Sequence, residues 1–242
     1  MVVPIDVELV AQDARKASKK GDLIIVVDAV RATTSIITSL ANGAKSVTPV
    51  QSLKEALQLH KEYPDYVLAG ERNGVKPEGF DLDNSPLSLA KEIVKGKNLI
   101  MSTTNGTKAL VQSKGSKWVT LGAFLNADAV AKKSVEIASD SKVGISFVLA
   151  GEEDHFALED FICAGAIIER LPKNAVQLSD KALGALLAFK GAKQNLQENI
   201  CKSKHAQDLI KIGFSKDIEF ACQLNLYNVV PFYKNGVIQI SD

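Results

Sequence analysis

Apolar runs of strand length alternate with amphipathic helical segments over residues 1–150, and this alternation restricts the fold more than any other feature. Residues 22–27 read as a buried strand and residues 31–43 as a helix, and the alternation continues to a buried strand at residues 142–151. Strands that alternate with amphipathic helices are typical of parallel sheets whose faces are covered by helices. The sequence therefore predicts the α/β class, with a mostly parallel or mixed sheet flanked by helices.

The pattern changes after Gly151. Helical segments follow at residues 156–171, 181–203 and 205–214. Short strand-like segments come next, at residues 217–224, 228–233 and 236–240. Lys234, Asn235 and Gly236 predict a hairpin turn between the last two. We expect an α/β lobe over residues 1–150 and an α+β C-terminal lobe over residues 151–242, although no linker or internal repeat marks the boundary and a single domain stays open.

The composition argues against several kinds of partner. The formal net charge is +1 over 242 residues, so neither nucleic acid nor an anionic membrane is indicated. Three cysteines without CxxC spacing predict reduced thiols in a cytoplasmic protein. We expect no signal peptide and no membrane span, because no apolar run has the required length and position. A homodimer is the default expectation for the oligomeric state, which the sequence leaves open.

Polar side chains follow the predicted strands. Ligands of open α/β sheets bind at the carboxyl ends of the strands, so these side chains are the candidates for a site. They are Asp28, Arg31, Thr33 and Thr34 after the first strand, Glu71, Arg72, Asn84 and Ser85 after residues 66–70, Thr103, Thr104, Asn105 and Gly106 after residues 98–102, and Glu152, Glu153, Asp154, Glu159 and Asp160 after residues 142–151.

Two of these clusters have the composition of an anion site. Residues 103–107, Thr-Thr-Asn-Gly-Thr, and residues 31–35, Arg-Ala-Thr-Thr-Ser, each stand at the start of a predicted helix. Backbone N–H groups and hydroxyls at such a position favour an anion, and an arginine adds a planar pair of donors. Ordinary N-capping would explain either cluster alone, but two clusters at strand ends favour anion binding. Nucleotide binding is not indicated, because neither GxxxxGK[ST] nor GxGxxG occurs.

The acidic residues suggest a cation. Asp28 ends a buried strand, where an unpaired carboxylate would be costly. Together with Glu159 or Asp160 it offers the hard oxygen ligands that Mg²⁺ prefers. The alternative for Glu159 and Asp160 is a favourable interaction with the helix dipole, and residues 152–154 read better as a solvated turn. No HExxH or Cys/His grouping suggests zinc, and no GxSxG motif suggests a serine hydrolase.

Several stretches of the chain, taken together, resemble one known family. They are DAVRATTSIITSLANGA, AGERNGVKPEGFDLDNSP, STTNGTKAL, LGAFLNADAVA, FALEDFICAGAI and KHAQDLIKIGFSKDIEFACQLNLYNVVP. In this order they resemble the signature stretches of the 2-phosphosulfolactate phosphatases, from Asp22 to Pro231. The resemblance implies an α/β enzyme that hydrolyses (R)-2-phospho-3-sulfolactate to (R)-3-sulfolactate and phosphate with Mg²⁺ as cofactor, as an early step of coenzyme M biosynthesis.

The chain departs from the family pattern at a few positions. The family usually has glycine where this chain has Asn73 and Asp83, and an aspartate is common where this chain has Asn225. A neutral polar run is usual at residues 152–154. Two of these changes, Asn73 and Asp83, lie in the long loop after residues 66–70. The conformation of this loop and the substrate preference therefore stay open.

The resemblance and the residue types together predict roles for the candidate residues. Asp28 is the first choice for the group that attacks phosphorus, activates water or binds the metal, with Asp160 as the second metal ligand. Glu71, Glu159 and Asp160 are further metal or general-acid candidates. Substrate-binding groups are expected at Arg31, Thr33, Thr34, Arg72, Asn84, Ser85, Thr103, Thr104, Asn105 and Gly106.

We expect these loops to surround one positively biased cavity for a small anionic phosphate ester. Two other functions stay open: a phosphatase for another small phosphate ester, and a non-catalytic protein that binds small organic anions.

Overall fold

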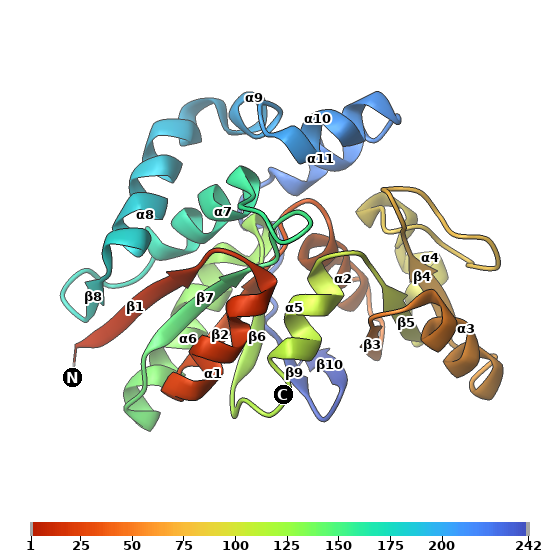
Figure 1. Ribbon diagram of the computed structural model, residues 1–242, viewed down its shortest axis with the longest axis horizontal. Coiled ribbons are helices and arrows are strands. Elements are labelled where there is room, and N and C mark those ends of the chain that lie inside the picture. Colours follow the sequence, from red (N-terminus) through yellow and green to blue (C-terminus); the bar gives the residue numbers. More distant parts are fainter. Residues whose placement is uncertain (1, 241–242) are drawn as a thin grey trace.

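Ten strands form one continuous sheet in the order β4-β5-β3-β10-β9-β6-β2-β7-β1-β8 (Figure 1). The computed structural model describes residues 2–240. The strands are β1 (Val3–Glu8), β2 (Leu23–Val27), β3 (Ser46–Val50), β4 (Val67–Gly70), β5 (Asn98–Ser102), β6 (Val119–Gly122), β7 (Ile145–Leu149), β8 (Val176–Leu178), β9 (Pro231–Lys234) and β10 (Val237–Ile240). All neighbours are parallel except at β9 and β10, which pair antiparallel with each other, with β6 and with β3. The predicted α/β class with a mixed sheet is therefore confirmed.

Helices cover both faces of this sheet. They are α1 (Ala14–Lys20), α2 (Ala32–Ala41), α3 (Leu53–Glu62), α4 (Lys91–Val94), α5 (Gly106–Gln112), α6 (Ala127–Ser141), α7 (Leu158–Ile168), α8 (Asp180–Ala192), α9 (Leu196–Ile200), α10 (Lys204–Lys211) and α11 (Ser215–Ala221). Strand β2 separates the two main cores: Ile25 packs in the cluster with α6, α7 and α8, and Ile24 in the cluster with α1, α2 and α5. Burial on both faces explains why β2 reads as a continuous apolar run.

The sheet contains an internal structural repeat that the sequence did not reveal. Strands β4-β5-β3 on one side of the β9–β10 hairpin correspond to β7-β2-β6 on the other. Ser102 at the end of β5 pairs with Val50 of β3, and Val27 at the end of β2 pairs with Gly122 of β6. Chain order is preserved as well, since β2-α2-β3-α3-β4 is followed by β5-α5-β6-α6-β7. The central strand of each set is thus supplied by the other repeat.

One element of the C-terminal part of the chain was predicted with the wrong type. Residues 217–224 were expected to be a strand, but most of them belong to helix α11. The expectation was wrong because a short apolar run fits either period, and here Asp217, Ile218 and Ala221 share the buried helical face. The predicted hairpin is confirmed, with Asn235 and Gly236 at positive φ.

Residues beyond Gly151 also build the main sheet. Strands β8, β9 and β10 all pair within it, and the division into lobes at residue 150 stays a prediction. Strands β1 and β8 were not predicted.

None of the helices within residues 2–240 has the length and apolar character needed to cross a membrane. The three cysteines are free thiols.

Helices α7 and α8 pack closely because Gly165 has no side chain. A Cβ on Gly165 would overlap the carbonyl oxygen of Ala185 in α8. We predict that Gly165→Ala lowers the free energy of unfolding by about 2 kcal/mol, because the two helices must separate. Gly191→Ala, on the open side of α8, is the matched control and should raise it by about 0.5 kcal/mol. Urea unfolding checks both, and equal stabilities of the two variants would contradict the close packing.

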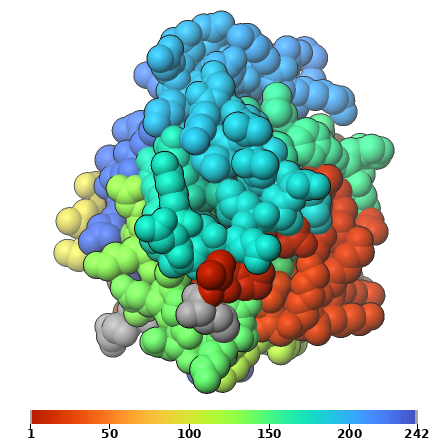
Figure 2. Space-filling model, turned by 90° about the vertical axis from the view of Figure 1, so that its left-hand side faces the viewer, coloured from red at the N-terminus to blue at the C-terminus, as the bar shows by residue number. Residues whose placement is uncertain are grey.

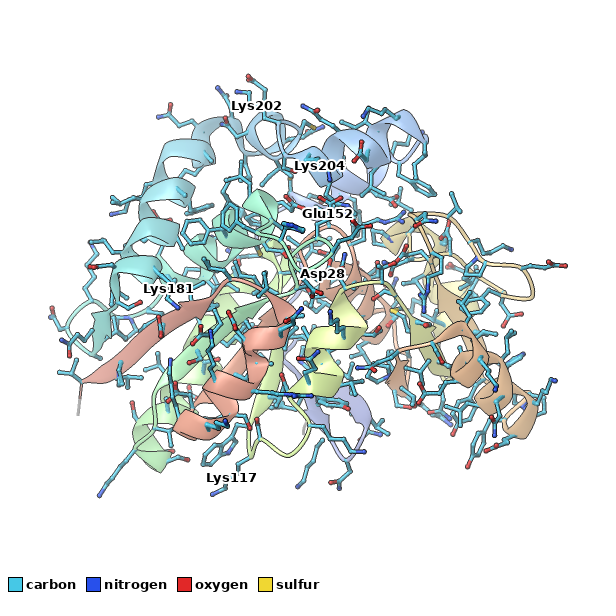
Figure 3. All side chains as sticks on the ribbon, in the orientation of Figure 1. Asp28, Lys117, Glu152, Lys181, Lys202 and Lys204 are labelled. Atoms are coloured by element: carbon cyan, nitrogen blue, oxygen red, sulfur yellow. The ribbon has the colours of Figure 1, made fainter. Side chains whose placement is uncertain are left out.

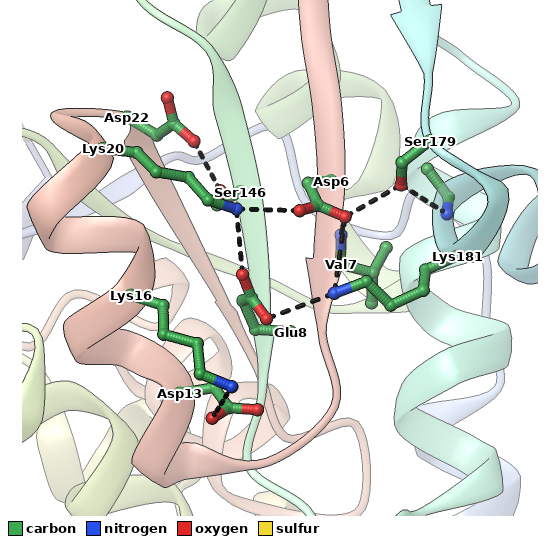
Figure 4. Close-up of polar contacts among 11 residues, drawn as sticks. Asp6, Val7, Glu8, Asp13, Lys16, Lys20, Asp22, Ser146, Ser179 and Lys181 are labelled. Carbon is green, nitrogen blue, oxygen red and sulfur yellow. Dashed lines mark hydrogen bonds and ion pairs between the residues drawn. The ribbon is translucent and has the colours of Figure 1, made fainter.

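A polar network stabilises the sheet edge formed by β1 and β8 (Figure 4). Figure 2 looks at this edge and shows the segment that includes α8, in cyan, against it. Lys20 Nζ lies 2.8 Å from Asp6 and 3.0 Å from Glu8. The Ser179 hydroxyl also donates to Asp6. Burial alone would raise the pKa of Asp6, but hydrogen bonds from Lys20, Ser179 and the Val7 N–H hold it below its ordinary value.

This lowered pKa makes the contribution of Asp6 to stability depend on pH. The stabilisation is complete above the unfolded-state pKa of Asp, near the ordinary value of 3.8, and is lost as the pH falls below it. We predict that Asp6→Asn lowers the free energy of unfolding by about 1 kcal/mol at pH 7, a modest value because Lys20 is partly exposed. The difference should shrink below about pH 4. Urea unfolding from pH 7 to pH 3 measures it, and a difference that is constant with pH would refute the role of the charge.

Candidate active site

A cavity of about 240 Å³ opens at the carboxyl ends of β2, β4, β5 and β7, beneath helix α10. Figure 3 shows Lys204 of α10, Glu152 and Asp28 one below another at this place. Nine of the predicted residues line it. They are Asp28, Arg31, Glu71, Asn84, Thr103, Thr104, Asn105, Glu159 and Asp160. The structure thus brings together side chains from the segments that follow four strands far apart in the sequence.

Asp28 and Asp160 form the deep side of the cavity. Asp28 Oδ1 accepts a hydrogen bond from the Ala32 N–H at 3.0 Å, and Oδ2 lies where Gly106 has no side chain. Asp160 accepts from the Ala29 N–H at 2.8 Å and from the Gly151 N–H at 3.1 Å. Asp160 therefore connects the loop after β2 to the loop after β7. The position of Asp28 explains why residue 106 is glycine, because a Cβ there would collide with the Asp28 carboxylate.

The two buried carboxylates disfavour each other's charge. Burial raises the pKa of Asp28 to about 6; the Ala32 N–H and His205 oppose the shift, and Glu71 and Glu159 add to it. Burial, followed by repulsion from Asp28 and Glu159, raises the pKa of Asp160 well above its ordinary range. Such shifts concentrate at functional sites, because a positive ligand or a proton is needed to relieve them.

Glu71 has a similar connecting role in the other half of the sheet. Its Oε1 accepts from the backbone N–H and the hydroxyl of Thr104, at 2.7 and 2.9 Å. Its Oε2 accepts from the Gly74 N–H at 2.8 Å. Glu71 thereby joins the loop after β5 to the loop after β4, as Asp160 joins those after β2 and β7. The sequence placed Glu71 at the site but gave no sign of this connecting role.

Arg31 lines the cavity, and its guanidinium also has protein partners. Nη1 donates to Asp217 of α11 at 2.8 Å, Nη2 donates to the Gly74 carbonyl at 2.7 Å, and the Phe214 ring lies 4.3 Å from the guanidinium carbon. The Ser85 hydroxyl donates to the second oxygen of Asp217 at 2.7 Å. Arg31 and Asp217 are 2% and 3% exposed in their side chains. This ion pair attaches α11 to the floor of the cavity.

Four further candidates support the loops from behind the cavity. The Thr33 hydroxyl donates to the carbonyls of Asp28 and Gly122, and the Thr34 hydroxyl to that of Ala29. Ser85 contacts Asp217. The guanidinium of Arg72 points elsewhere and donates to the Gln51 carbonyl, the Ser102 hydroxyl and the Glu71 carbonyl. Direct substrate contact by these residues stays a prediction.

Sequence reasoning missed much of the cavity wall. Glu152 and Glu153 were read as a solvated turn, and both line the cavity. Helix α10 adds His205 and Asp208, and the sequence gave no signal for them beyond an amphipathic helix. Carboxylates outnumber basic side chains in the lining, at Asp28, Glu71, Glu152, Glu153, Glu159, Asp160 and Asp208 against Arg31 and His205. The protein alone therefore does not supply the positive bias that we expected.

The oxygen atoms that line the cavity suit a magnesium ion held by a few carboxylates better than a metal enclosed entirely by protein ligands. Within residues 2–240, no group of three or more His, Cys, Asp or Glu side chains is arranged to enclose a metal. Mg²⁺ usually binds one or two carboxylates, and water and substrate phosphate complete its coordination. Asp28 and Asp160, two adjacent buried carboxylates, suit this mode of binding.

Comparison with known proteins agrees with the resemblance noted in the sequence. The model of the family described as "2-phosphosulpholactate phosphatase" matches residues 9–236. A protein of Clostridium acetobutylicum named "Probable 2-phosphosulfolactate phosphatase" is 39% identical over 97% of this chain and 99% of its own length. A protein of Thermotoga petrophila with the same name is 42% identical over 90% of this chain and 92% of its own.

The structure accommodates two departures from the family pattern. Asn73 has φ of 53° and Asn225 has φ of 58°, both in the left-handed region. Asparagine tolerates this region better than most residues, so the turn at position 73 keeps a backbone that suits glycine. Nothing in the structure explains Asp83 beyond its acceptance of the Ser85 N–H.

The buried ion pair at Arg31 leads to a stability prediction. Asp217→Asn should lower the free energy of unfolding by about 3 kcal/mol, because it leaves the Arg31 charge buried without its partner. Asp208→Asn, which breaks an exposed pair with Lys211 within α10, is the control and should leave the free energy of unfolding nearly unchanged. Thermal and urea unfolding measure both variants, and a near-neutral Asp217→Asn would show that the pair does not hold α11.

Proposed function

Because the chain belongs to the 2-phosphosulpholactate phosphatase family, we propose that it hydrolyses 2-phospho-3-sulfolactate to 3-sulfolactate and phosphate, with Mg²⁺ as cofactor. The acidic, partly buried cavity at the carboxyl ends of the strands is the observation that supports this proposal most. The proposed setting is cytoplasmic, in coenzyme M biosynthesis, and the proposed assembly is a homodimer.

The charge of the cavity supports a role for a cation. The substrate carries phosphate, sulfonate and carboxylate groups, whereas the lining is dominated by carboxylates. Two unit charges of the same sign 4 Å apart repel each other by about 4 kcal/mol near a protein surface. An anionic ester therefore binds well only when a divalent ion offsets the acidic lining. When bound, Mg²⁺ would supply charge neutralisation at the phosphoryl oxygens.

The residues have distinct parts in this proposal. Asp28 and Asp160 would hold the ion. Asp28, on the deep side of the cavity, would also accept the proton of the attacking water. Thr103, Thr104 and Asn105, which follow β5, also line the cavity and would orient the other anionic groups. Glu159 lines the cavity next to Asp160 and remains a second acidic candidate for proton transfer.

Another small phosphate ester is the first alternative for the substrate. The reason is that the loop after β4 differs from the family pattern at Asn73 and Asp83. A non-catalytic anion-binding protein is the alternative from another class. It would have no use for the buried pair Asp28 and Asp160, whose mutual repulsion destabilises an empty site. The presence of this pair therefore favours catalysis.

We predict phosphate release from 2-phospho-3-sulfolactate that requires Mg²⁺ and stops with EDTA. Asp28→Asn should lower kcat by about 10³-fold while the protein stays folded, because it removes both a metal ligand and the proton acceptor. Asp154→Asn is the matched control: this exposed carboxylate pairs with Lys108 and does not line the cavity. A panel of other phosphate esters tests the substrate.

Two results would decide against the proposal. Release of phosphate at the same rate in EDTA would refute the need for a divalent ion. Binding of the ester with no turnover under any metal would favour the anion-binding protein.

A further inference from the structure

His205 is the one imidazole that lines the cavity, among the residues that the structure describes. It lies at the start of α10, where the Ser203 hydroxyl caps the helix by accepting from the Ala206 N–H. Its Nδ1 is 3.5 Å from Glu152 Oε1, on the loop after β7. Its side chain is 27% exposed, so the ring lies between solvent and the buried carboxylates. A contact of Nδ1 with Glu152 leaves Nε2 available to a ligand.

The proposed reaction needs a proton donor, and three carboxylates of the lining are engaged as acceptors, which leaves Glu159 as the carboxylate alternative to the imidazole. Cleavage of an alkyl phosphate ester leaves an alkoxide, which departs readily only when it is protonated. Both oxygens of Asp160 accept backbone N–H bonds, both oxygens of Glu71 are occupied in the same way, and Asp28 accepts the Ala32 N–H. These N–H bonds favour the charged form of each carboxylate, and the charged form has no proton to donate. Arginine does not release a proton, which excludes Arg31.

The surroundings of His205 suit a proton donor. Glu152 contacts its ring, Lys204 precedes it in α10 and also pairs with Glu152, and Asp208 of α10 lines the same cavity. From the sheet, Asp28 lines the same cavity. The imidazole is thus on the open side of the cavity and Asp28 on the deep side. In an ester bound between them, the side attacked by water would face Asp28 and the leaving oxygen would face His205.

We propose that His205 donates the proton to the leaving oxygen of the phosphate ester, and that Glu152 is a positioning residue that holds its ring through Nδ1. This inference rests on the proposed phosphatase function. Water attacks phosphorus and passes its proton to Asp28. The bond between phosphorus and the ester oxygen breaks, its electron pair stays on that oxygen, and the proton of His205 Nε2 completes the alcohol. Proton exchange with solvent then restores both side chains.

The test compares two leaving groups in the presence of Mg²⁺. p-Nitrophenyl phosphate releases a stable phenolate and needs no acid, whereas 2-phospho-3-sulfolactate releases an alkoxide. His205→Gln should lower kcat about 10³-fold for the alkyl ester and less than about 10-fold for the aryl ester, with KM nearly unchanged. Glu152→Gln should show the same selectivity with a smaller loss, about 10-fold. His60→Gln, on the distant helix α3, is the matched control and should leave both rates unchanged.

The pH dependence of kcat for the alkyl ester is a second test of the role of His205. A proton donor makes kcat fall at alkaline pH, and His205→Gln should remove that fall. An equal loss for the two esters, or an alkaline limb that persists in the variant, would overturn the role of His205. Full activity of the variant would overturn it as well. If the unchanged protein releases no phosphate from either ester, the proposed function fails and this inference falls with it.

Discussion

Two buried carboxylates connect the loops around the cavity, and the remainder of the site depends on them. Asp160 accepts backbone N–H groups from the loops after β2 and β7, and Glu71 accepts those from the loops after β4 and β5. Buried N–H groups without acceptors would cost about 1–3 kcal/mol each, so these bonds fix the loops as well as join them. Without them, the sheet would still position the four strand ends, but the loops that follow would lack these connections.

The internal repeat explains how such a site arises from a mostly parallel sheet. By register, Thr103 after β5 corresponds to Asp28 after β2, and the Thr33 and Thr107 hydroxyls donate to the carbonyls of these two residues. One repeat thus presents a carboxylate and the other a hydroxyl at the same place. In the proposed function, this difference divides the cavity into a side that holds a cation and a side that donates to anionic oxygens.

The first half of the fold followed from the sequence because its strands are buried on both faces and its helices are amphipathic. Strands β1 and β8 escaped notice because β1 carries Pro4, Asp6 and Glu8 among its six residues, and the edge strand β8 has only three. The repeat was missed because it resides in strand order and register. These properties are set by packing between distant segments and leave little trace in residue identity.

The site was predicted in part for a related reason. Residues that follow strands, such as Asp28, Glu71 and Asn105, were found from position alone, because strand ends meet at one edge. Asp217 and His205 lie on helices far along the chain, and only folding brings them to Arg31 and Glu152. Arg72 matched the expected chemistry, yet its guanidinium is used to support the loop after β4.

The central claim is that a divalent ion makes this acidic cavity suitable for an anionic ester. Anomalous diffraction from crystals grown with Mn²⁺ and inorganic phosphate tests it most directly, since Mn²⁺ accepts the same oxygen ligands as Mg²⁺. The account predicts an anomalous peak in contact with Asp28 and Asp160, with phosphate bound to the same ion. Phosphate bound in the cavity with no metal beside it, or a metal bound only elsewhere on the protein, would contradict it.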